Sequence, residues 1–405
     1  MSSTLLLSPF PNFEPLGLKH RAIINEFNSQ LNSSYSDFQF SSLFGLDDNN
    51  TIKVSNLNGN MVVVMQDSVS GVNLASFLGV NQVDKSTREL LLYVKEELST
   101  DCLSFLPRIT VKRLADRGQF EISTDEANSD YLYDAAEIID LKGRKYAAVR
   151  RKVNLCRRKY KPGITCFLGA TPEGGRPHRN YGGGRRPPQE KSLIEKCWDL
   201  QQQITAEKIF DSNEMVLSWQ RDNAGLEKLF LFWDKLELIL CTVEMEGQIR
   251  AFAVVELIPQ QTLLIHHFTT DTKFAGISEY LFWCLADSFT SGAPRPYSRG
   301  SSTCFVGRNP PKRTLLRSSS YEGLPSSHSS PPLRTGLSAK EGKVKFINFE
   351  QDLGFPGLRR FKNHLQPCGM LKKYVVRWSR TDYKYLRPEV TPRLPDGQGF
   401  SALSR

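Results

Sequence analysis

Between residues 236 and 378, strand-like and helix-like segments follow one another in an order that few folds accommodate. Three short apolar segments come first, and the turn Glu246-Gly247 joins the first two. Their length and β-branched content predict buried strands, and their spacing predicts an antiparallel meander. A helix, a strand, a second helix and a last strand are predicted to follow. The predicted ranges are 236–244, 249–257 and 262–268 for the meander, then 274–289, 344–349, 357–365 and 370–378.

A meander followed by this alternation is the order expected of an N-acyltransferase (GNAT) fold. The first 130 residues also predict mixed structure, because helical periodicity at 19–31 and 87–98 alternates with strand-like runs. We therefore expect an α+β protein. The predicted strands of this first part are 43–54, 61–65, 108–112 and 120–122. Further along the chain, before the meander, helices are predicted at 192–209 and 225–236.

Length and composition limit the number of domains and exclude several classes of protein. At about 150 residues per domain, 405 residues suggest two domains. No apolar run approaches the roughly 18 to 20 residues that span a bilayer, and the N-terminus does not resemble a secretory signal. The eight cysteines are never closer than ten positions, so no metal site is predicted. We expect a cytoplasmic location without a transmembrane segment.

Two segments have the composition of disordered insertions. The segment 162–189 has seven Gly and five Pro, and 291–340 has twelve Ser, seven Pro and five Gly. Neither can bury enough apolar surface to offset its ordering entropy. We expect an N-terminal domain at 1–129, a C-terminal domain at 130–390 interrupted by both insertions, and a disordered tail at 391–405.

A basic block lies on a predicted helix from Asp134 to Tyr160. Between Lys142 and Lys161 there are ten basic residues and no acidic one, although the whole chain carries only +10. Such a block attracts polyanions such as RNA, phosphates or lipid headgroups. A solvated helix face explains the same pattern equally well. The candidate phosphate-binding residues here are Lys145, Arg150, Arg151, Arg157 and Arg158.

An acidic pair follows the predicted strand 344–349. Glu350 and Asp352 stand at the exit of the strand, before a turn at Gly354 and a helix that opens at Pro356. Carboxylates in this position can act as a base toward a hydroxyl or an amine. Asp352 can instead stabilise the positive end of the next helix. Arg359 and Lys362 lie three residues apart on that helix, where they could hold a phosphate or face solvent.

Two segments carry a family resemblance. One contains Asp130-Tyr-Leu-Tyr-Asp134 and Leu141-Lys-Gly-Arg-Lys-Tyr146 and continues to Tyr160. The other contains Phe346-Ile-Asn-Phe-Glu-Gln-Asp-Leu-Gly354, the helix with Arg359 and Lys362, and Lys372-Lys-Tyr-Val-Val376. Together they resemble the C-terminal domain family of the phosphatidylglycerol lysyltransferases, which is similar to the Fem-type peptidyl transferases. The resemblance extends over about residues 10–380, insertions excluded.

The resemblance implies two tandem GNAT-like domains and transfer of an acyl or aminoacyl group. The donor would be aminoacyl-tRNA or acyl-CoA as co-substrate, with no resident cofactor, and the acceptor an amine or a hydroxyl. Glu350 and Asp352 would be catalytic. Members commonly carry Lys-Arg-Asn where this chain has Val149, Arg150 and Arg151, and an arginine where it has Phe349.

Other features leave the function open. Lys273, Gly276 and Ser278 weakly resemble the loop that binds the CoA pyrophosphate in GNAT enzymes, although a plain turn before a helix explains them too. His266 and His267 lie in an apolar strand, where such a pair is more often structural than catalytic. The alternative to a transferase is a catalytically silent GNAT-fold protein that binds RNA or an anionic phospholipid, with peripheral contact to an anionic membrane.

Overall fold

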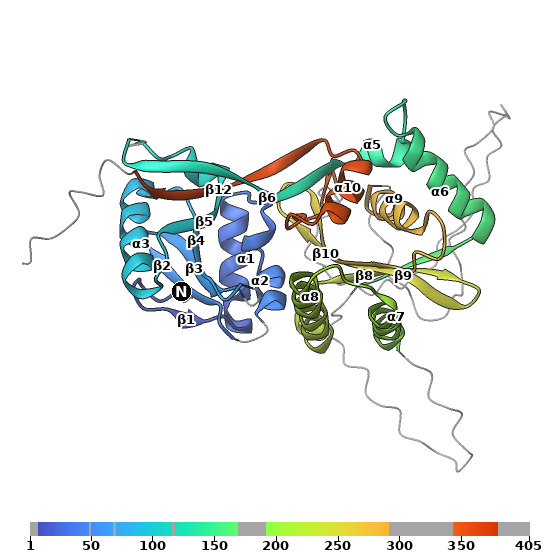
Figure 1. Ribbon diagram of the computed structural model, residues 1–405, viewed down its shortest axis with the longest axis horizontal. Coiled ribbons are helices and arrows are strands. Elements are labelled where there is room, and N and C mark those ends of the chain that lie inside the picture. The colour runs from blue at the N-terminus through green and yellow to red at the C-terminus, as the bar shows by residue number, and fades with distance from the viewer. Residues whose placement is uncertain are drawn as a thin grey trace, which may run out of the picture.

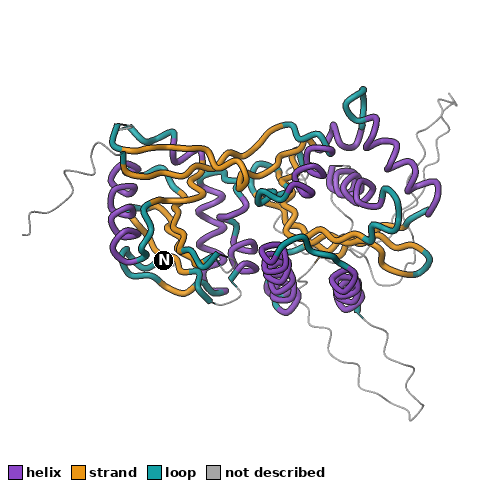
Figure 2. The backbone as a smooth tube through the Cα atoms, in the orientation of Figure 1, coloured by secondary structure: helices purple, strands orange, loops and turns teal. Residues whose placement is uncertain are grey.

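The computed structural model describes residues 7–47, 50–67, 70–115, 118–168, 192–290 and 343–379. Its strands form two sheets, which helices flank (Figures 1 and 2). The smaller sheet is antiparallel and lies entirely in the N-terminal part of the chain. Its four strands, in spatial order, are β1 (Glu14–Pro15), β2 (Lys53–Leu57), β3 (Asn60–Gln66) and β4 (Asn73–Leu78).

The larger sheet has eight strands. The predicted meander forms three neighbouring strands toward one edge of this sheet, and β11 pairs with the last meander strand in parallel. Every other neighbouring pair is antiparallel. In spatial order the strands are β5 (Cys102–Pro107), β12 (Gly369–Trp378), β6 (Phe120–Asp134), β11 (Phe346–Asn348), β10 (Thr262–Thr270), β9 (Gln248–Ile258), β8 (Ile239–Met245) and β7 (Gly163–Leu168).

Two long strands join the N-terminal and C-terminal parts. β6 and β12 pair along most of their length, from Phe120 opposite Trp378 to Leu132 opposite Gly369. Figure 1 shows them side by side, running from the N-terminal part of the molecule to the C-terminal part. The C-terminal end of β6 also pairs with β11. The segment that follows β11 is therefore held where the N-terminal and C-terminal parts of the chain meet.

Helices cover both faces of the larger sheet. The α-helices are α1 (Arg21–Gln30), α2 (Phe40–Leu46), α3 (Val83–Glu97), α4 (Arg108–Val111), α5 (Ala135–Asp140), α6 (Ala147–Tyr160), α7 (Leu193–Glu207), α8 (Asn213–Leu231), α9 (Ile277–Thr290) and α10 (Pro356–His364). Single 3₁₀ turns lie at η1 (Leu18–His20), η2 (Ser36–Phe38) and η3 (Trp233–Lys235).

Three apolar cores result. In β9, Phe252 and Val254 face a core shared with α1, α2, α7 and α8, whereas Ala251, Ala253 and Val255 face a second core shared with α5, α6 and α9. A strand covered on both faces needs a continuous apolar run rather than an alternating one, and this explains the sequence of β9. The third core lies between α3, the smaller sheet and the far ends of β5 and β12.

The α+β class and the GNAT-like order of elements are confirmed. After the meander, α9, β11, α10 and β12 follow as predicted, within a few residues at each end. The predicted boundary at 129/130 lies inside β6, which is one continuous strand. The insertion at 291–340 and the tail at 391–405 lie outside the described residues, as do residues 169–189 of the first insertion.

Four local predictions were wrong. Residues 43–46 belong to helix α2, because Leu43 and Phe44 pack in the core shared with α8, and a strand starts only at Lys53. Residues 108–111 form the short helix α4 after Pro107. The helix expected from Asp134 to Tyr160 is two helices, since Leu141 and Gly143 adopt positive φ between them. The segment 163–168, expected to be disordered, is the edge strand β7 on β8.

Within the described part of the chain, none of the helices combines the length and the apolar content needed to cross a membrane.

Candidate functional site

Glu350 lies in a bend directly after β11, and its backbone adopts φ +50°. This left-handed conformation is uncommon for residues other than glycine and asparagine. Three hydrogen bonds hold the bend: the Glu350 amide donates to Asn348 Oδ1 at 2.8 Å, the Tyr131 amide donates to the Glu350 carbonyl at 3.0 Å, and the Phe349 amide donates to the Tyr131 carbonyl at 2.9 Å. The pairing of β11 with β6 therefore fixes where the Glu350 side chain points.

The carboxyl group of Glu350 lies in a largely desolvated and charged environment. Its side chain is 27% exposed, and Oε1 lies 3.8 Å from Nδ1 of His266. Burial raises the pKa of Glu350 to about 7, with a further rise from Asp130, while His266, Lys362 and Lys373 act in the opposite direction. A partly accessible carboxyl that titrates near neutrality has the acidity suited to a general base.

The carboxylate of Asp352, in contrast, is buried and accepts hydrogen bonds through both of its oxygens. Its side chain is 1% exposed. One carboxylate oxygen accepts from Tyr131 Oη at 2.6 Å and from Arg359 Nε at 2.8 Å, and the other accepts from Arg359 Nη2 at 3.0 Å and the Gly354 amide at 2.8 Å. Burial raises the pKa of Asp352, but these hydrogen bonds outweigh burial and lower it. This geometry fits an anchor between β6, the bend and α10.

The two cations of α10 also contact the bend. The guanidinium of Arg359 donates to the Asp352 carboxylate, although the Arg359 side chain remains 47% exposed. Lys362 is 3% exposed, and its ammonium donates to the carbonyls of Phe349 and of Gln351, the latter at 2.7 Å. Burial lowers the pKa of Lys362 to about 8. Lys362 thus holds the backbone of the bend, and its ammonium is not presented to an outside phosphate.

Phe349 explains the departure from the family pattern at that position. Its ring lies in the apolar core, stacked on Phe282 with centroids 5.5 Å apart and in contact with Phe268 and Phe361. Lys362 Nζ lies 4.7 Å above the same ring. The position before Glu350 therefore contributes packing in this chain.

A buried ion cluster next to Glu350 was missed by the sequence analysis. Lys373 Nζ donates to Asp130 Oδ1 at 2.6 Å and pairs with Asp37, and Lys373 and Asp130 have fully buried side chains. Asp130 also accepts from Ser36 Oγ at 2.8 Å and from Asn348 Nδ2 at 3.0 Å. Burial raises the pKa of Asp37 to about 6, whereas Lys373 opposes that rise. Asp130 lies in the first of the two motif segments and Lys373 lies in the second. Their presence in these segments was the sequence signal that could have indicated the cluster.

The basic residues of the α5–α6 region divide into engaged and exposed groups. Arg150 donates to the carbonyls of Leu141 and Gly143, and Arg157 lies 5.1 Å from the Trp283 ring centroid. Lys145 pairs with Glu137 at 2.8 Å. Arg151 and Arg158 are exposed on α6, and Arg158 Nε donates to the Asn154 carbonyl at 3.3 Å.

The loop that resembles a CoA site packs against α6. Gly276 has φ +84°, and a Cβ there would lie 2.3 Å from the Lys152 carbonyl oxygen. The neighbouring Ala275 amide donates to Tyr160 Oη at 3.3 Å, while Lys273 pairs with Glu207 at 2.6 Å and Ser278 Oγ lies 2.7 Å from Thr270 Oγ1. The glycine is thus explained by the close approach of α6 to this loop.

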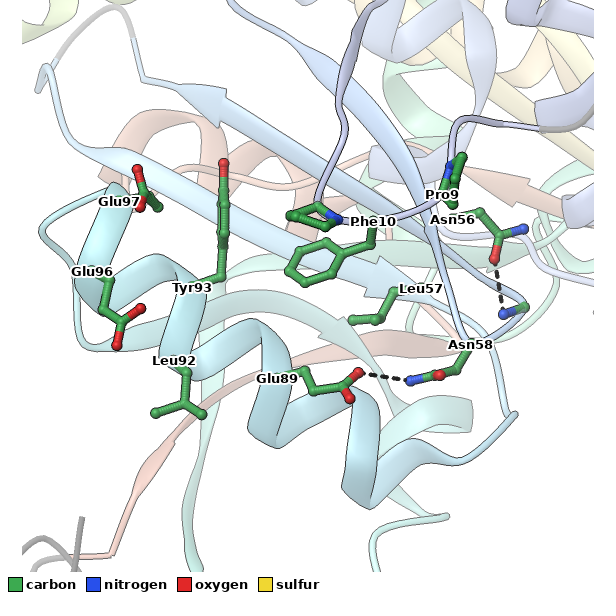
Figure 3. A pocket seen from close by; sticks show the side chains of 12 residues that line it. Pro9, Phe10, Asn56, Leu57, Asn58, Glu89, Leu92, Tyr93, Glu96 and Glu97 are labelled. Atoms are coloured by element: carbon green, nitrogen blue, oxygen red, sulfur yellow. Dashed lines mark hydrogen bonds between the residues drawn. The ribbon is translucent and has the colours of Figure 1, made fainter. Parts of the chain in front are cut away.

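A cavity of about 970 Å³ lies elsewhere, in the N-terminal part (Figure 3). Figure 3 shows Phe10 next to Tyr93, and their ring centroids lie 5.2 Å apart in an edge-to-face arrangement, with Glu89, Glu96 and Glu97 on α3. None of the predicted site residues lines this cavity. Among the described residues there is no cluster of His, Cys, Asp and Glu that could hold a metal ion.

Comparisons with known proteins agree with the motif analysis. The family described as phosphatidylglycerol lysyltransferase, C-terminal, matches residues 28–171, which confirms the predicted resemblance for that part of the chain. A comparison with curated proteins gave no match.

Solved structures resemble the chain over nearly its whole length. A conserved protein of unknown function from Bacteroides thetaiotaomicron is 18% identical, with a TM-score of 0.64, over 91% of this chain and 99% of that one, and shares its fold. The C-terminal domain of a putative lysylphosphatidylglycerol synthetase from Agrobacterium fabrum aligns at 12% identity and a TM-score of 0.46, over 91% and 94%. L-PGS from Bacillus licheniformis aligns at the same two values, over 92% and 93%.

Proposed function

Starting from residues 28–171, which match the phosphatidylglycerol lysyltransferase C-terminal family, we propose that this chain transfers an acyl or aminoacyl group to an amine or a hydroxyl. The GNAT-like fold suits this reaction class, although a fold by itself does not define chemistry. The groups at the bend after β11 supply the chemistry.

Glu350 is the observation that carries the proposal. In acyl transfer the attacking amine or hydroxyl must lose a proton as it bonds to the acyl carbon. A base works best when its pKa is near the working pH, and the pKa of Glu350 is raised to about 7. Its carboxyl is also the part of the acidic pair that keeps some exposure, at 27% against 1% for Asp352.

The other residues of the bend then position Glu350. Asp352 ties α10 to Tyr131 through Arg359, and Lys362 holds the carbonyls on both sides of Glu350. These contacts support a rigid base, which reduces the reorganisation needed during the reaction. We accordingly assign Glu350 the catalytic role and Asp352, Arg359 and Lys362 positioning roles.

The donor in this proposal is aminoacyl-tRNA or acyl-CoA. Both carry phosphates, and the exposed guanidinium groups of Arg151 and Arg158 could bind them. The packing of Gly276 against α6 offers less support to a CoA loop at Lys273–Ser278 than the sequence suggested. The acceptor, a cytoplasmic location and contact with an anionic membrane remain predictions.

A second candidate is a silent protein that binds RNA or an anionic phospholipid. The exposed basic face of α6 favours it, because Leu155 is also 41% exposed beside Arg151 and Arg158. Transfer assays with both donor classes separate the two candidates, and Glu350→Gln tests the proposed base. Loss of transfer in a folded variant supports the first candidate.

A further inference from the structure

The strand β10 carries an irregularity at His266. Its pairing with β9 runs from Ile265 opposite Val255 directly to His267 opposite Val254, so His266 has no partner across the strands. A bulged residue of this kind turns its side chain away from the regular alternation, and bulges are common beside active sites. The His266 side chain, which is only 3% exposed, points toward Glu350 from this bulge.

Both ring nitrogens of His266 have defined neighbours. Nε2 lies 2.9 Å from Glu256 Oε2 on β9. Nδ1 lies 3.2 Å from Ser42 Oγ on α2 and 3.8 Å from Glu350 Oε1. When Nε2 carries a hydrogen and donates it to Glu256, Nδ1 is left with its lone pair toward Ser42 and Glu350.

The neighbouring histidine shows what a purely structural one looks like in the same strand. His267 contacts Gln201 Oε1 at 3.3 Å and Thr269 Oγ1 at 2.9 Å and stacks on Phe252. Among the described residues, no carboxylate hydrogen-bonds or ion-pairs with it, and burial, with a smaller contribution from Lys208, lowers its pKa to about 4. His266 differs because it lies between two carboxylates.

We propose that His266, held by Glu256, is the positioning residue that accepts the proton which Glu350 removes from the attacking group. This inference rests on the proposed function. The N–H or O–H bond of the acceptor breaks, and an O–H bond forms on Glu350. Once Oε1 and Nδ1 approach from 3.8 Å to hydrogen-bond distance, that O–H bond breaks and an N–H bond forms at Nδ1 of His266. The Glu256 carboxylate stabilises the resulting imidazolium through Nε2, and the proton returns by the same route to the leaving oxygen or sulfur of the donor.

Several charges face this pair from the surrounding elements. Glu256 on β9 faces His266, whereas Asp130 on β6, Lys362 on α10 and Lys373 on β12 contribute to the field at Glu350. Removing the imidazole takes away the positive charge that His266 carries when protonated, so the titration midpoint of Glu350 should rise.

The test is a ¹³C NMR titration of the full chain labelled at glutamate carboxyls, with the Glu350 signal assigned from Glu350→Gln. We expect His266→Gln to raise the Glu350 midpoint by about one pH unit or more, the usual effect of one nearby opposite charge. His364→Gln is the matched control, since His364 pairs with Glu279 at 3.2 Å, away from Glu350. The control should leave the Glu350 midpoint unchanged.

Glu256→Gln provides a second variant, because it keeps a hydrogen-bond acceptor at Nε2 but removes the charge that favours the imidazolium. Like His266→Gln, the Glu256→Gln substitution should raise the titration midpoint of Glu350. An unchanged midpoint in folded His266→Gln and Glu256→Gln would overturn the inference whether or not the protein transfers anything. If the midpoints shift in a protein that shows no transfer, the result would support the pairing of His266 with Glu350. It would then count only against the proposed transfer function. Where transfer is measurable, the acid limb of its pH profile should move with the NMR midpoint.

Discussion

The ammonium of Lys373 on β12 lies 2.6 Å from the carboxylate of Asp130 on β6, and both side chains are completely buried. The two residues belong to different motif segments, 243 positions apart in the chain. Because β6 also pairs with β11, this ion pair fixes the strands from which the Glu350 bend emerges. The motif segments are thus linked through one desolvated contact beside the proposed base.

Replacing Lys373 with methionine is expected to lower the free energy of unfolding by roughly 3–5 kcal/mol, because it leaves Asp130 and Asp37 buried without their cation. Urea unfolding measures this. Lys372→Met is the matched control, since Lys372 is exposed on the same strand and should change stability by less than about 0.5 kcal/mol. Equal effects of the two substitutions would show that the buried pair does not hold the strands.

The pH dependence of stability should report the environment of Glu350. Its pKa is raised from the usual 4.5 to about 7, so between these values the unfolded state binds fewer protons than the folded state. Stability contributed by this group is therefore lost as pH rises through that window. Glu350→Gln should flatten the decline between pH 5 and pH 7.5 in urea unfolding. The exposed Glu246 also has a positive φ, so Glu246→Gln is the control that should keep the wild-type slope.

Gly276→Ala should destabilise the protein by more than backbone strain alone. Both Gly276 and Gly247 have positive φ, but a Cβ at Gly247 meets nothing within 4 Å, whereas one at Gly276 would collide with the Lys152 carbonyl. Gly247→Ala is therefore expected to cost about 1 kcal/mol, and Gly276→Ala clearly more. Thermal unfolding compares the two. Similar melting temperatures would mean that α6 does not pack closely on the loop.

The exposed arginines of α6 should govern any binding of tRNA. Affinity should fall as salt rises, and Arg151→Gln/Arg158→Gln should reduce the log–log slope by up to about 0.7–0.9 per lost phosphate contact. Arg150→Gln/Arg157→Gln removes the same charge from side chains already engaged with carbonyls and Trp283, and should change the slope less. If neither pair alters the slope, the basic block is only a solvated face.

The sequence predicted well what local patterns determine. The meander and the β-α-β order after it follow from apolar periodicity. Residues 43–46 were predicted wrongly because packing of α2 on α8 decides their conformation. β7 was missed because glycine and proline dominate the composition around it, whereas Ile164 and Cys166 still pair with β8 and form the edge of the sheet.

The candidate site could be predicted only in part. The order of Glu350, Asp352 and Gly354 indicated a bend at a strand exit, but not which carboxylate stays accessible, since that depends on Arg359, Tyr131 and the positive φ at Glu350. Asp37 and Lys373 meet only because η2 and β12 come together in the fold. His266 looked structural in the sequence, because a bulge cannot be read from an apolar strand pattern.

The role of Glu350 as general base is measured by the transfer rate of Glu350→Gln beside that of Asp352→Asn, with aminoacyl-tRNA and acyl-CoA as alternative donors. We expect Glu350→Gln to lose about 100-fold or more of the transfer rate, the usual contribution of a general base, with its melting temperature maintained. Asp352→Asn should instead lower the melting temperature, because it weakens buried, charge-assisted hydrogen bonds worth roughly 1–3 kcal/mol. Wild-type transfer by the Glu350→Gln protein would contradict the account, and absence of transfer by the wild type with either donor would favour the silent binding protein.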